Sequence, residues 1–380
     1  MSDSLILTNA RIVTIDSVIS GSLEVHCGKI VSVDRGNTSL PGAIDLDGDY
    51  LIAGMVELHT DNMEKHFTPR PGVTWPPLSA AIAHDVQVIG AGITTVYDAL
   101  SIGDIMQDSS RMRQLDEMAQ TIQVGRKNQV LRADHYLHMR CELSFEGVVD
   151  LFRPFCHNPL VRLVSVMDHA PGQRQFLDVG KYREYYQGKY HFSDTQMDAF
   201  IARHHRSSEM FSDTYRGQIV ALCREHALPM ASHDDATPEH IDQAAQSGMV
   251  ISEFPTTMAA AAAAREKGLN ILMGAPNVVR GMSHSGNVSA RDLAANDCLD
   301  IISSDYFPGS LLQAAFAMHR QMKGISLPQA IAMATRNPAR AVGLNDRGEI
   351  AAGKRADLVR VREVGDLPVV GAVWTQGRRM

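Results

Sequence analysis

The stretch LIAGMVELHTD, residues 51–61, ends an apolar run of strand length on two ionisable side chains. His59 and Asp61 stand two positions apart, so on a β-strand both side chains face the same side. Neutral imidazoles and carboxylates suit zinc, manganese or iron, and a shared carboxylate can hold two ions. The pair therefore predicts a metal site at the end of this strand.

Seven further apolar runs of strand length follow, and helical patterns separate them. They cover residues 93–98, 135–143, 162–167, 228–232, 249–253, 270–274 and 299–303. Eight strands that alternate with helices fit a (β/α)8 barrel of the TIM type, which we expect over residues 51–348. A doubly wound open sheet is the alternative, but no G-x-G-x-x-G motif opens the first strand-to-helix turn.

The two ends of the chain differ from the middle in their residue pattern. Residues 1–50 and 349–380 consist of short β-prone runs punctuated by glycine and asparagine. Because chain termini often lie close together in space, we expect the two segments to form one composite β-sandwich domain.

Most of the predicted barrel strands end in an ionisable residue. The carboxyl ends of barrel strands meet at one mouth, where enzymes of this fold have their sites. Carboxylates buried together without cations would repel one another and lose hydration, so the cluster supports metal binding. The further candidate ligands are Glu142, His169, His233 and Asp305. His135, His138 and Asp168 are equally suited to supporting the ligands.

Composition excludes several classes of protein. The chain has 380 residues and a formal net charge of -7, so it offers no general electrostatic footprint for nucleic acid. No apolar run is long enough for a membrane helix. The five cysteines are odd in number and form no C-x-x-C pair, which favours a reducing compartment. No export signal is visible at the N-terminus, so we expect a cytoplasmic location.

Longer motifs resemble a known family. LIAGMVELHTD and the tail GEIAAGKRADLVRV are similar to the amidohydrolase superfamily, whose members carry a catalytic barrel and a small β-sandwich made from both chain ends. HTDNMEKHFTPRPGVTWP, ASHDDAT and MGAPNVVRGMSHSGNV resemble a branch of that superfamily, the diphosphatases of the carbon–phosphorus lyase pathway. The resemblance covers essentially the full length.

The sequence departs from the superfamily pattern at three places. The usual His-x-His of the first strand is here His59-Thr-Asp61. The bridging lysine of many members is not evident, and Glu142 is a candidate to take its place. The two later ligand positions belong either to His169 and His233, which we favour, or to His233 and Glu253.

The resemblance implies hydrolysis of alpha-D-ribose 1-methylphosphonate 5-triphosphate, a small phosphorylated ribose phosphonate, to the 5-phosphate and pyrophosphate. A hydroxide on a divalent ion would attack the α-phosphorus, with Asp305 as ligand and general base. We expect a binuclear site, with zinc first and manganese or iron as alternatives. Cationic side chains must hold the phosphoryl oxygens. The candidates are Arg70, Arg174, Lys189, Arg280 and His284, with Lys65 as a weaker one.

Two other hypotheses remain open at the level of sequence. The metal motif alone also suits an amidohydrolase that cleaves a C–N bond, such as a deacetylase or a cyclic amidase. A barrel that has lost its chemistry and serves as a scaffold would lack metal ligands, and this chain retains them. An alanine-rich helix and exposed strand ends would permit a homodimer.

Overall fold

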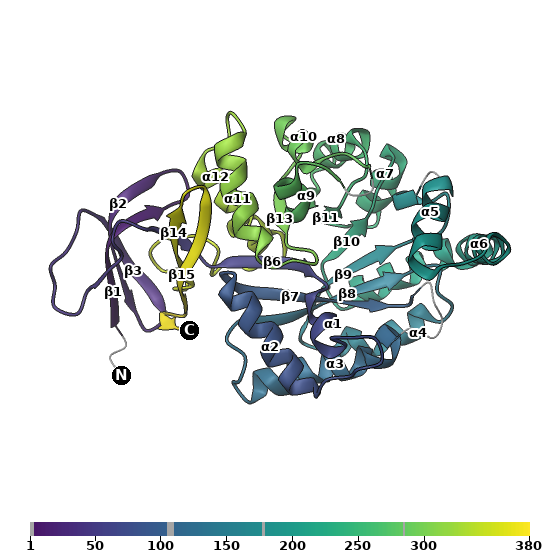
Figure 1. Ribbon diagram of the computed structural model, residues 1–380, viewed down its shortest axis with the longest axis horizontal. Coiled ribbons are helices and arrows are strands. Elements are labelled where there is room, and N and C mark those ends of the chain that lie inside the picture. Colours follow the sequence, from purple (N-terminus) through teal and green to yellow (C-terminus); the bar gives the residue numbers. More distant parts are fainter. Residues whose placement is uncertain (1–3, 105–109, 177–178, 284–285) are drawn as a thin grey trace.

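The computed structural model consists of a barrel and a separate β-sheet beside it (Figure 1). It describes residues 4–104, 110–176, 179–283 and 286–380. Among these residues, no helix is both long and apolar enough to cross a membrane.

Eight parallel strands form the barrel wall in the order of the sequence. All eight of the predicted strands are confirmed. They are β6 (Met55–Thr60), β7 (Ile93–Ile102), β8 (Asp134–Glu142), β9 (Val161–Met167), β10 (Met230–His233), β11 (Ile251–Glu253), β12 (Asn270–Gly274) and β13 (Ile301–Ser303).

The first and last strands meet at the residues that the sequence singled out. The backbone N–H of Asp61 donates to the carbonyl oxygen of Asp305 at 3.1 Å, and the N–H of Asp305 donates to the carbonyl oxygen of His59 at 3.1 Å. The hydroxyl of Thr60 adds a third hydrogen bond, to the Asp305 carbonyl at 2.8 Å. The seam of the barrel therefore fixes His59, Asp61 and Asp305 side by side.

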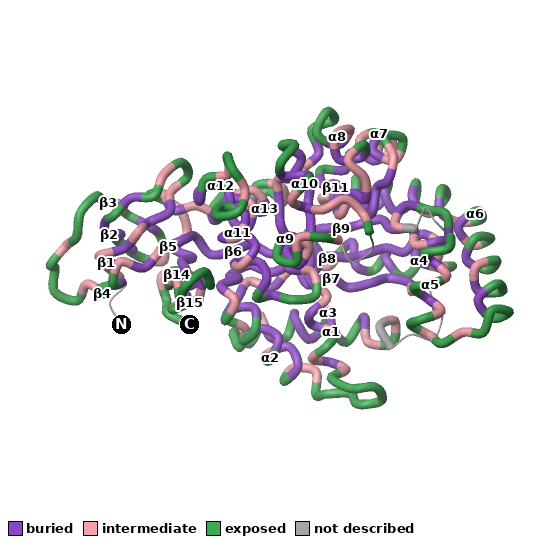
Figure 2. Tube along the Cα trace, turned by 45° about the horizontal axis from the view of Figure 1, so that its top comes forward, coloured by how far each residue is buried: buried purple, intermediate pink, exposed green. Residues whose placement is uncertain are grey.

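Helices cover the outside of the barrel. They are α1 (Asn62–Phe67), α2 (Pro77–Gly90), α3 (Ser110–Lys127), α4 (Val148–Phe152), α7 (Pro238–Gln246), α8 (Met258–Glu266), α9 (Ala275–Arg280), α10 (Ala290–Ala295), α11 (Ser310–Gln321), α12 (Leu327–Ala332) and α13 (Arg336–Ala341), with short 3-10 turns at Arg153–His157 and Arg174–Phe176. The barrel strands are almost entirely buried beneath them (Figure 2).

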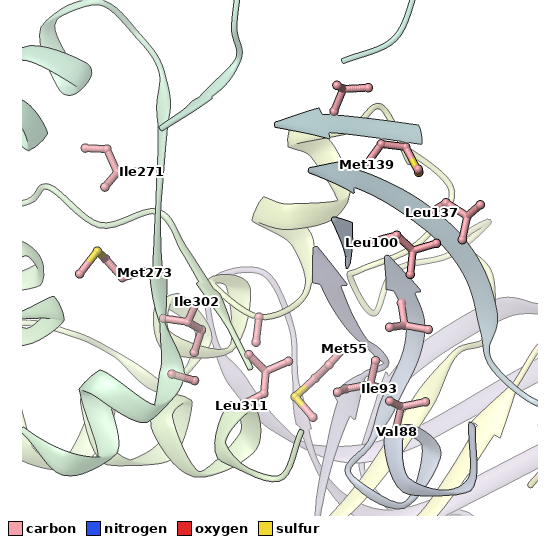
Figure 3. Close-up of a cluster of buried hydrophobic side chains, with 14 of the residues drawn as sticks. Met55, Val88, Ile93, Leu100, Leu137, Met139, Ile271, Met273, Ile302 and Leu311 are labelled. Carbon is pink, nitrogen blue, oxygen red and sulfur yellow. The ribbon is translucent and has the colours of Figure 1, made fainter. Parts of the chain in front are cut away.

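Two hydrophobic clusters lie on opposite faces of the barrel strands. Ile271 and Met273 of β12 belong to a large cluster that includes Leu311 of α11 (Figure 3). Leu272, between them, belongs to a smaller cluster with Leu163 and other residues of the strands. Successive strand residues point to opposite faces, so the first cluster joins strands to helices and the second fills the barrel interior.

The polar stretch over residues 174–210 is largely helical. It contains α5 (Val179–Tyr190) and the start of the long α6 (Asp194–Glu225). Ser193 begins α6 with a reciprocal capping box to Gln196, which satisfies amide groups that the helix itself leaves open. Buried aromatic side chains such as Tyr182 and Phe200 hold the two helices together. The pair is therefore an ordered unit with its own small core.

Strands from both chain ends form the second sheet, as expected. They are β1 (Ser4–Val13), β2 (Val18–His26), β3 (Lys29–Arg35), β4 (Ile44–Asp45), β5 (Tyr50–Ala53), β14 (Leu358–Val364), β15 (Leu367–Thr375) and β16 (Arg378–Arg379). One hydrogen-bonded sheet contains all eight, and β5 joins the N-terminal strands to β14. Its own core includes Leu23, Leu46 and Trp374. The domain boundaries at residues 50 and 349 stay predictions.

Candidate metal centre and substrate cavity

A cavity of about 450 Å³ opens at the carboxyl ends of the barrel strands. The predicted ligands His59, Asp61, Glu142, His169, His233 and Asp305 all line it. Its walls also include Tyr185 and Tyr190 of α5 and Arg280 at the end of α9. The strand ends and the helical insertion thus share one chamber.

The first group of donor atoms comes from the two strands that close the barrel. His59, Asp61 and Asp305 each offer one atom, and these atoms lie within 4.8 Å of one another. Nε2 of His59 is 4.0 Å from Oδ1 of Asp61. Asp305 has a backbone φ of 55°. This left-handed conformation is uncommon for residues other than glycine, although Asp adopts it more readily than most.

A second donor group consists of His169, His233 and Asp234. Oδ2 of Asp234 lies 3.5 Å from Nε2 of both histidines. This oxygen is buried and has no hydrogen-bond partner among the residues that the structure describes. Asp234 also has a positive φ, of 56°. A buried carboxylate oxygen that faces two imidazole nitrogens at this spacing is the arrangement that a divalent cation would complete.

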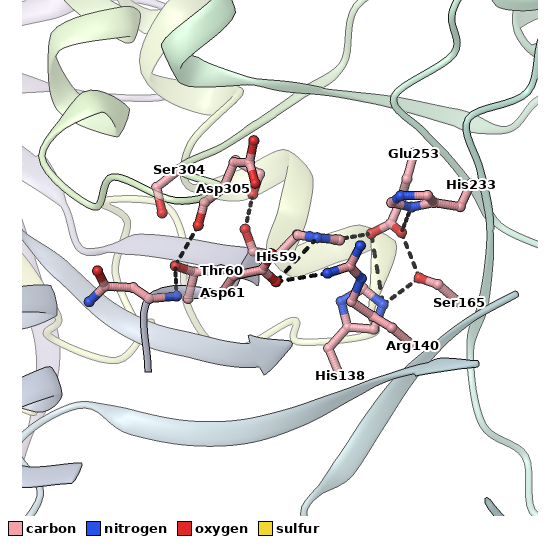
Figure 4. Close-up of polar contacts among 12 residues, drawn as sticks. His59, Thr60, Asp61, His138, Arg140, Ser165, His233, Glu253, Ser304 and Asp305 are labelled. Carbon is pink, nitrogen blue, oxygen red and sulfur yellow. Dashed lines mark hydrogen bonds and ion pairs between the residues drawn. The ribbon is translucent and has the colours of Figure 1, made fainter. Parts of the chain in front are cut away.

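Glu253 contacts the Nδ1 atom of one histidine in each donor group (Figure 4). Its Oε1 is 3.1 Å from Nδ1 of His59, and its Oε2 is 3.1 Å from Nδ1 of His233. Ser165 donates to Oε2 at 2.5 Å. Burial alone would raise the pKa of Glu253, but the neighbouring imidazoles of His138 and His59 hold it well below its ordinary value. The carboxylate therefore fixes a proton on each Nδ1 and leaves each Nε2 free to bind.

Glu142 stands in the same relation to His169. Its Oε2 lies 2.6 Å from Nδ1 of His169, and Ser144 donates to its Oε1 at 2.6 Å. Burial would raise the pKa of Glu142, but the charge and hydrogen bond of His169 lower it. In this arrangement Glu142 orients a candidate ligand, and its own role as a ligand stays a prediction.

Two further histidines of β8 have supporting positions. His138 is fully buried, with Nδ1 2.9 Å from the Leu58 carbonyl oxygen and Nε2 against Ser165. His135 lies with Nδ1 2.7 Å from Oδ2 of Asp98, in a buried cluster outside the cavity lining. Their ring nitrogens are engaged by hydrogen bonds that stabilise the strands.

The two donor groups fit divalent metal ions. Each combines imidazole nitrogen with carboxylate oxygen, a mixture suited to zinc, manganese or iron. Each is partly buried and opens to the cavity, and partners at Nδ1 of the imidazoles fix their orientation, as metal sites require. The fit rests on donor type and on the unpartnered Asp234 oxygen.

The predicted substrate-binding residues do not all lie at the cavity. Lys189 and Arg280 line the cavity. Arg174 does not: it is 3% exposed and is ion-paired with Asp235. Arg70 is exposed in a short loop and is also absent from the lining. His284 lies outside the described residues.

Sequence reasoning missed two residues of the cavity. Asp234 follows His233 directly, and the alternation of a strand would place it on the opposite face; its left-handed backbone turns it back toward the histidines. Arg140, two residues before Glu142, carries a charge that no metal motif requires. For Asp234, the only available signal was the acidic pair after His233.

Comparisons with known proteins agree with this geometry. The model of the amidohydrolase family matches residues 191–380. The chain is 48% identical over 377 residues to the alpha-D-ribose 1-methylphosphonate 5-triphosphate diphosphatase of Escherichia coli (strain K12), covering 99% of this chain and 100% of that protein.

Solved structures of other enzymes share the fold. A 5-methylcytosine deaminase from Klebsiella pneumoniae superimposes with a TM-score of 0.67 at 13% identity, covering 99% of this chain and 97% of that one. An N-acetylglucosamine-6-phosphate deacetylase from Pasteurella multocida has a TM-score of 0.63 at 14% identity, with 99% of both chains covered. At identities this low, the similarity shows only that the fold is shared.

Proposed function

The chain belongs to the amidohydrolase family, and from that premise we propose that it hydrolyses alpha-D-ribose 1-methylphosphonate 5-triphosphate to the 5-phosphate and pyrophosphate. The full-length identity of 48% to a diphosphatase of that substrate carries the proposal. The cavity supports it, because cationic side chains at its wall and carboxylates at its floor are arranged around one chamber.

Residues of the two donor groups would hold divalent ions, one at His59, Asp61 and Asp305 and a second at His169, His233 and Asp234. What such an ion supplies when bound is Lewis acidity, which lowers the pKa of water and neutralises phosphoryl charge. Zinc is our first choice for the ion, with manganese and iron as alternatives. Two donor groups at the cavity support a binuclear site, and elemental analysis would count the ions.

Asp305 is the residue that we assign as proton acceptor. It lies at the seam of the barrel, and its backbone is hydrogen-bonded to His59 and Asp61. An attacking water must lose a proton as its oxygen bonds to the α-phosphorus and as pyrophosphate departs. Lys189 and Arg280, which line the same cavity, would hold the phosphoryl oxygens of the departing group.

Hydrolysis in ¹⁸O-water tests both the bond that breaks and the class of reaction. Attack at the α-phosphorus places ¹⁸O in the ribose 5-phosphate product, which phosphorus NMR detects as an isotope shift. Label in pyrophosphate instead would show attack at the β-phosphorus. Release of ammonia or an amine from an amide substrate, without pyrophosphate from the triphosphate, would favour the C–N hydrolase.

The role of Asp305 is tested by Asp305→Asn. We expect kcat to fall by about 10²–10⁴, the range for loss of a general base. Asp366→Asn, at an exposed turn between β14 and β15, is the matched control and should retain full activity. Near-normal kcat in Asp305→Asn would assign the proton to another group. The homodimer stays a prediction, to be tested by light scattering.

A further inference from the structure

Arg140 is a buried cation inside the candidate metal centre. It stands near the carboxyl end of β8 and lines the cavity, with a side chain that is 11% exposed. Its Nη1 donates to Oδ1 of Asp61 at 2.8 Å. Figure 4 shows the guanidinium reaching from β8 to Asp61, beside His59. Arg140 therefore contacts a residue that we assign to metal binding.

The hydrogen bonding of this guanidinium is incomplete. Nε of Arg140 is buried and has no hydrogen-bond partner within the described part of the chain. The guanidinium of Arg140 is protonated throughout the physiological pH range, as arginine is in proteins generally. A buried charge is costly unless it is paired and hydrogen-bonded. The printed contact with Asp61 engages Nη1 and leaves Nη2 as a further donor for an anionic ligand, whereas the buried Nε is closed to solvent.

We propose that Arg140 binds a non-bridging oxygen of the phosphoryl group under attack and thereby selects phosphoanhydrides as substrates. The inference rests on the proposed function. Asp61 belongs to the donor group with His59 and Asp305, so a phosphoryl group that reacts there lies next to the guanidinium. Arginine presents paired N–H donors that match two phosphoryl oxygens, and such contacts are strongest where water is excluded.

The charge of the cavity explains why an anionic substrate needs such a residue. Carboxylates of Asp61, Glu142, Asp234 and Asp305 line the chamber and would repel a polyphosphate. Bound divalent ions offset part of this charge, and a fixed guanidinium offsets more of it at the reacting group. A neutral amide carbonyl has no comparable requirement. Arg140 therefore distinguishes phosphoanhydride from amide chemistry within this barrel.

A purely structural role for Arg140 makes a different prediction. If the guanidinium serves only to hold Asp61 in place, its removal weakens metal binding, and excess metal restores the affinity for the substrate. If it contacts phosphoryl oxygen, its removal weakens anion binding while the metal content stays unchanged. The two roles therefore separate in a measurement that does not depend on turnover.

The experiment measures binding of ribose 5-phosphate, whose phosphate corresponds to the phosphoryl group under attack, to metal-loaded protein by calorimetry, with metal content by elemental analysis. We expect Arg140→Gln to keep its metal and to raise the Kd of ribose 5-phosphate about tenfold to a hundredfold, as for loss of a charge-assisted contact. Arg140→Lys keeps the charge but loses the planar fork, so we expect only partial recovery. Arg162→Gln, an exposed arginine on neighbouring β9, is the matched control and should match the wild type.

An unchanged Kd in Arg140→Gln would overturn the proposal, as would a Kd that returns to the wild-type value on adding metal. Arg140→Lys decides the question if the glutamine variant does not fold: a wild-type Kd there would show that the fork is not used. Failure of the wild type to release pyrophosphate from the ribose triphosphate would instead refute the proposed function, and the binding titration would remain interpretable on its own.

Discussion

Replacing Glu253 with glutamine should weaken metal binding at the candidate centre with almost no change in side-chain volume. The two carboxylate oxygens each accept from one imidazole Nδ1, at 3.1 Å to His59 and 3.1 Å to His233. Glutamine offers one acceptor oxygen and one NH₂ group in the same space. The oxygen can satisfy one histidine, but the NH₂ group then faces the Nδ1–H of the other. That second imidazole must move its proton to Nε2, the nitrogen that would bind metal.

The expected magnitude follows from these contacts. Loss of a hydrogen bond to a charged group costs about 1.5–3 kcal/mol. Partners behind ligating histidines are worth about 10–100-fold in metal affinity. We therefore expect Glu253→Gln to bind zinc about tenfold to a hundredfold more weakly than the wild type, as measured by competition with a chromophoric chelator. Glu363→Gln, on β14 of the terminal sheet, is the control with the same chemical change.

Zinc affinity in Glu253→Gln equal to that of the wild type would refute the reasoning, because it would mean that Glu253 does not set the tautomers of the two histidines. A loss of affinity in Glu363→Gln as well would point to a general effect on stability. Circular dichroism at the same protein concentration separates these outcomes, because it reports whether either variant has lost its secondary structure.

Three further predictions concern charged residues at different depths. Arg280→Ala should raise KM or lower kcat while leaving bound metal unchanged, because the residue lines the cavity outside both donor groups; loss of metal would assign it a structural role. Arg174→Ala should lower the free energy of unfolding by about 3–5 kcal/mol, since it leaves the buried Asp235 carboxylate unpaired, and a change in KM at normal stability would contradict this. Burial would raise the pKa of Asp134, but Arg355 and Arg347 lower it. The Asp134 carboxylate therefore stabilises the fold at pH above its ordinary pKa of 3.8, and this stabilisation is lost as pH falls through the lower pKa of the folded state. Urea midpoints at neutral and acidic pH should therefore converge between the wild type and Asp134→Asn as the pH is lowered, and parallel curves would exclude that role.

The architecture could be predicted from the sequence because strand length and composition follow from burial. Ile93–Ile102 is buried at every position, so its apolar residues identify it without knowledge of its partners. His59 and Asp61 could be paired because their spacing is local to one strand. Their proximity to Asp305 needed only the rule that strand ends meet at one mouth of a barrel.

The remaining features depend on local backbone and on long-range partners. Asp234 enters the cavity through a positive φ that the residue type does not require. Arg174 resembled a substrate-binding residue in a polar segment, but it turns inward to Asp235, a carboxylate 61 residues away in the chain. Glu253 resembled a ligand, and its place behind two imidazoles depends on the register of β10 against β11, which pairs His233 with Glu253. Pairing of this kind cannot be read from either segment alone.

The hydrogen bonds that close the barrel can form only after most of the chain has been synthesised. Thr60 and Asp305 are separated by 245 positions, and the hydrogen bond between them forms only when the last strand reaches the first. A nascent chain in which β13 has not yet been synthesised contains His59 and Asp61 but lacks Asp305, the third residue of their donor group. The donor group of His59, Asp61 and Asp305 is therefore complete only after Asp305 has been synthesised, and a chain truncated before that residue cannot assemble it.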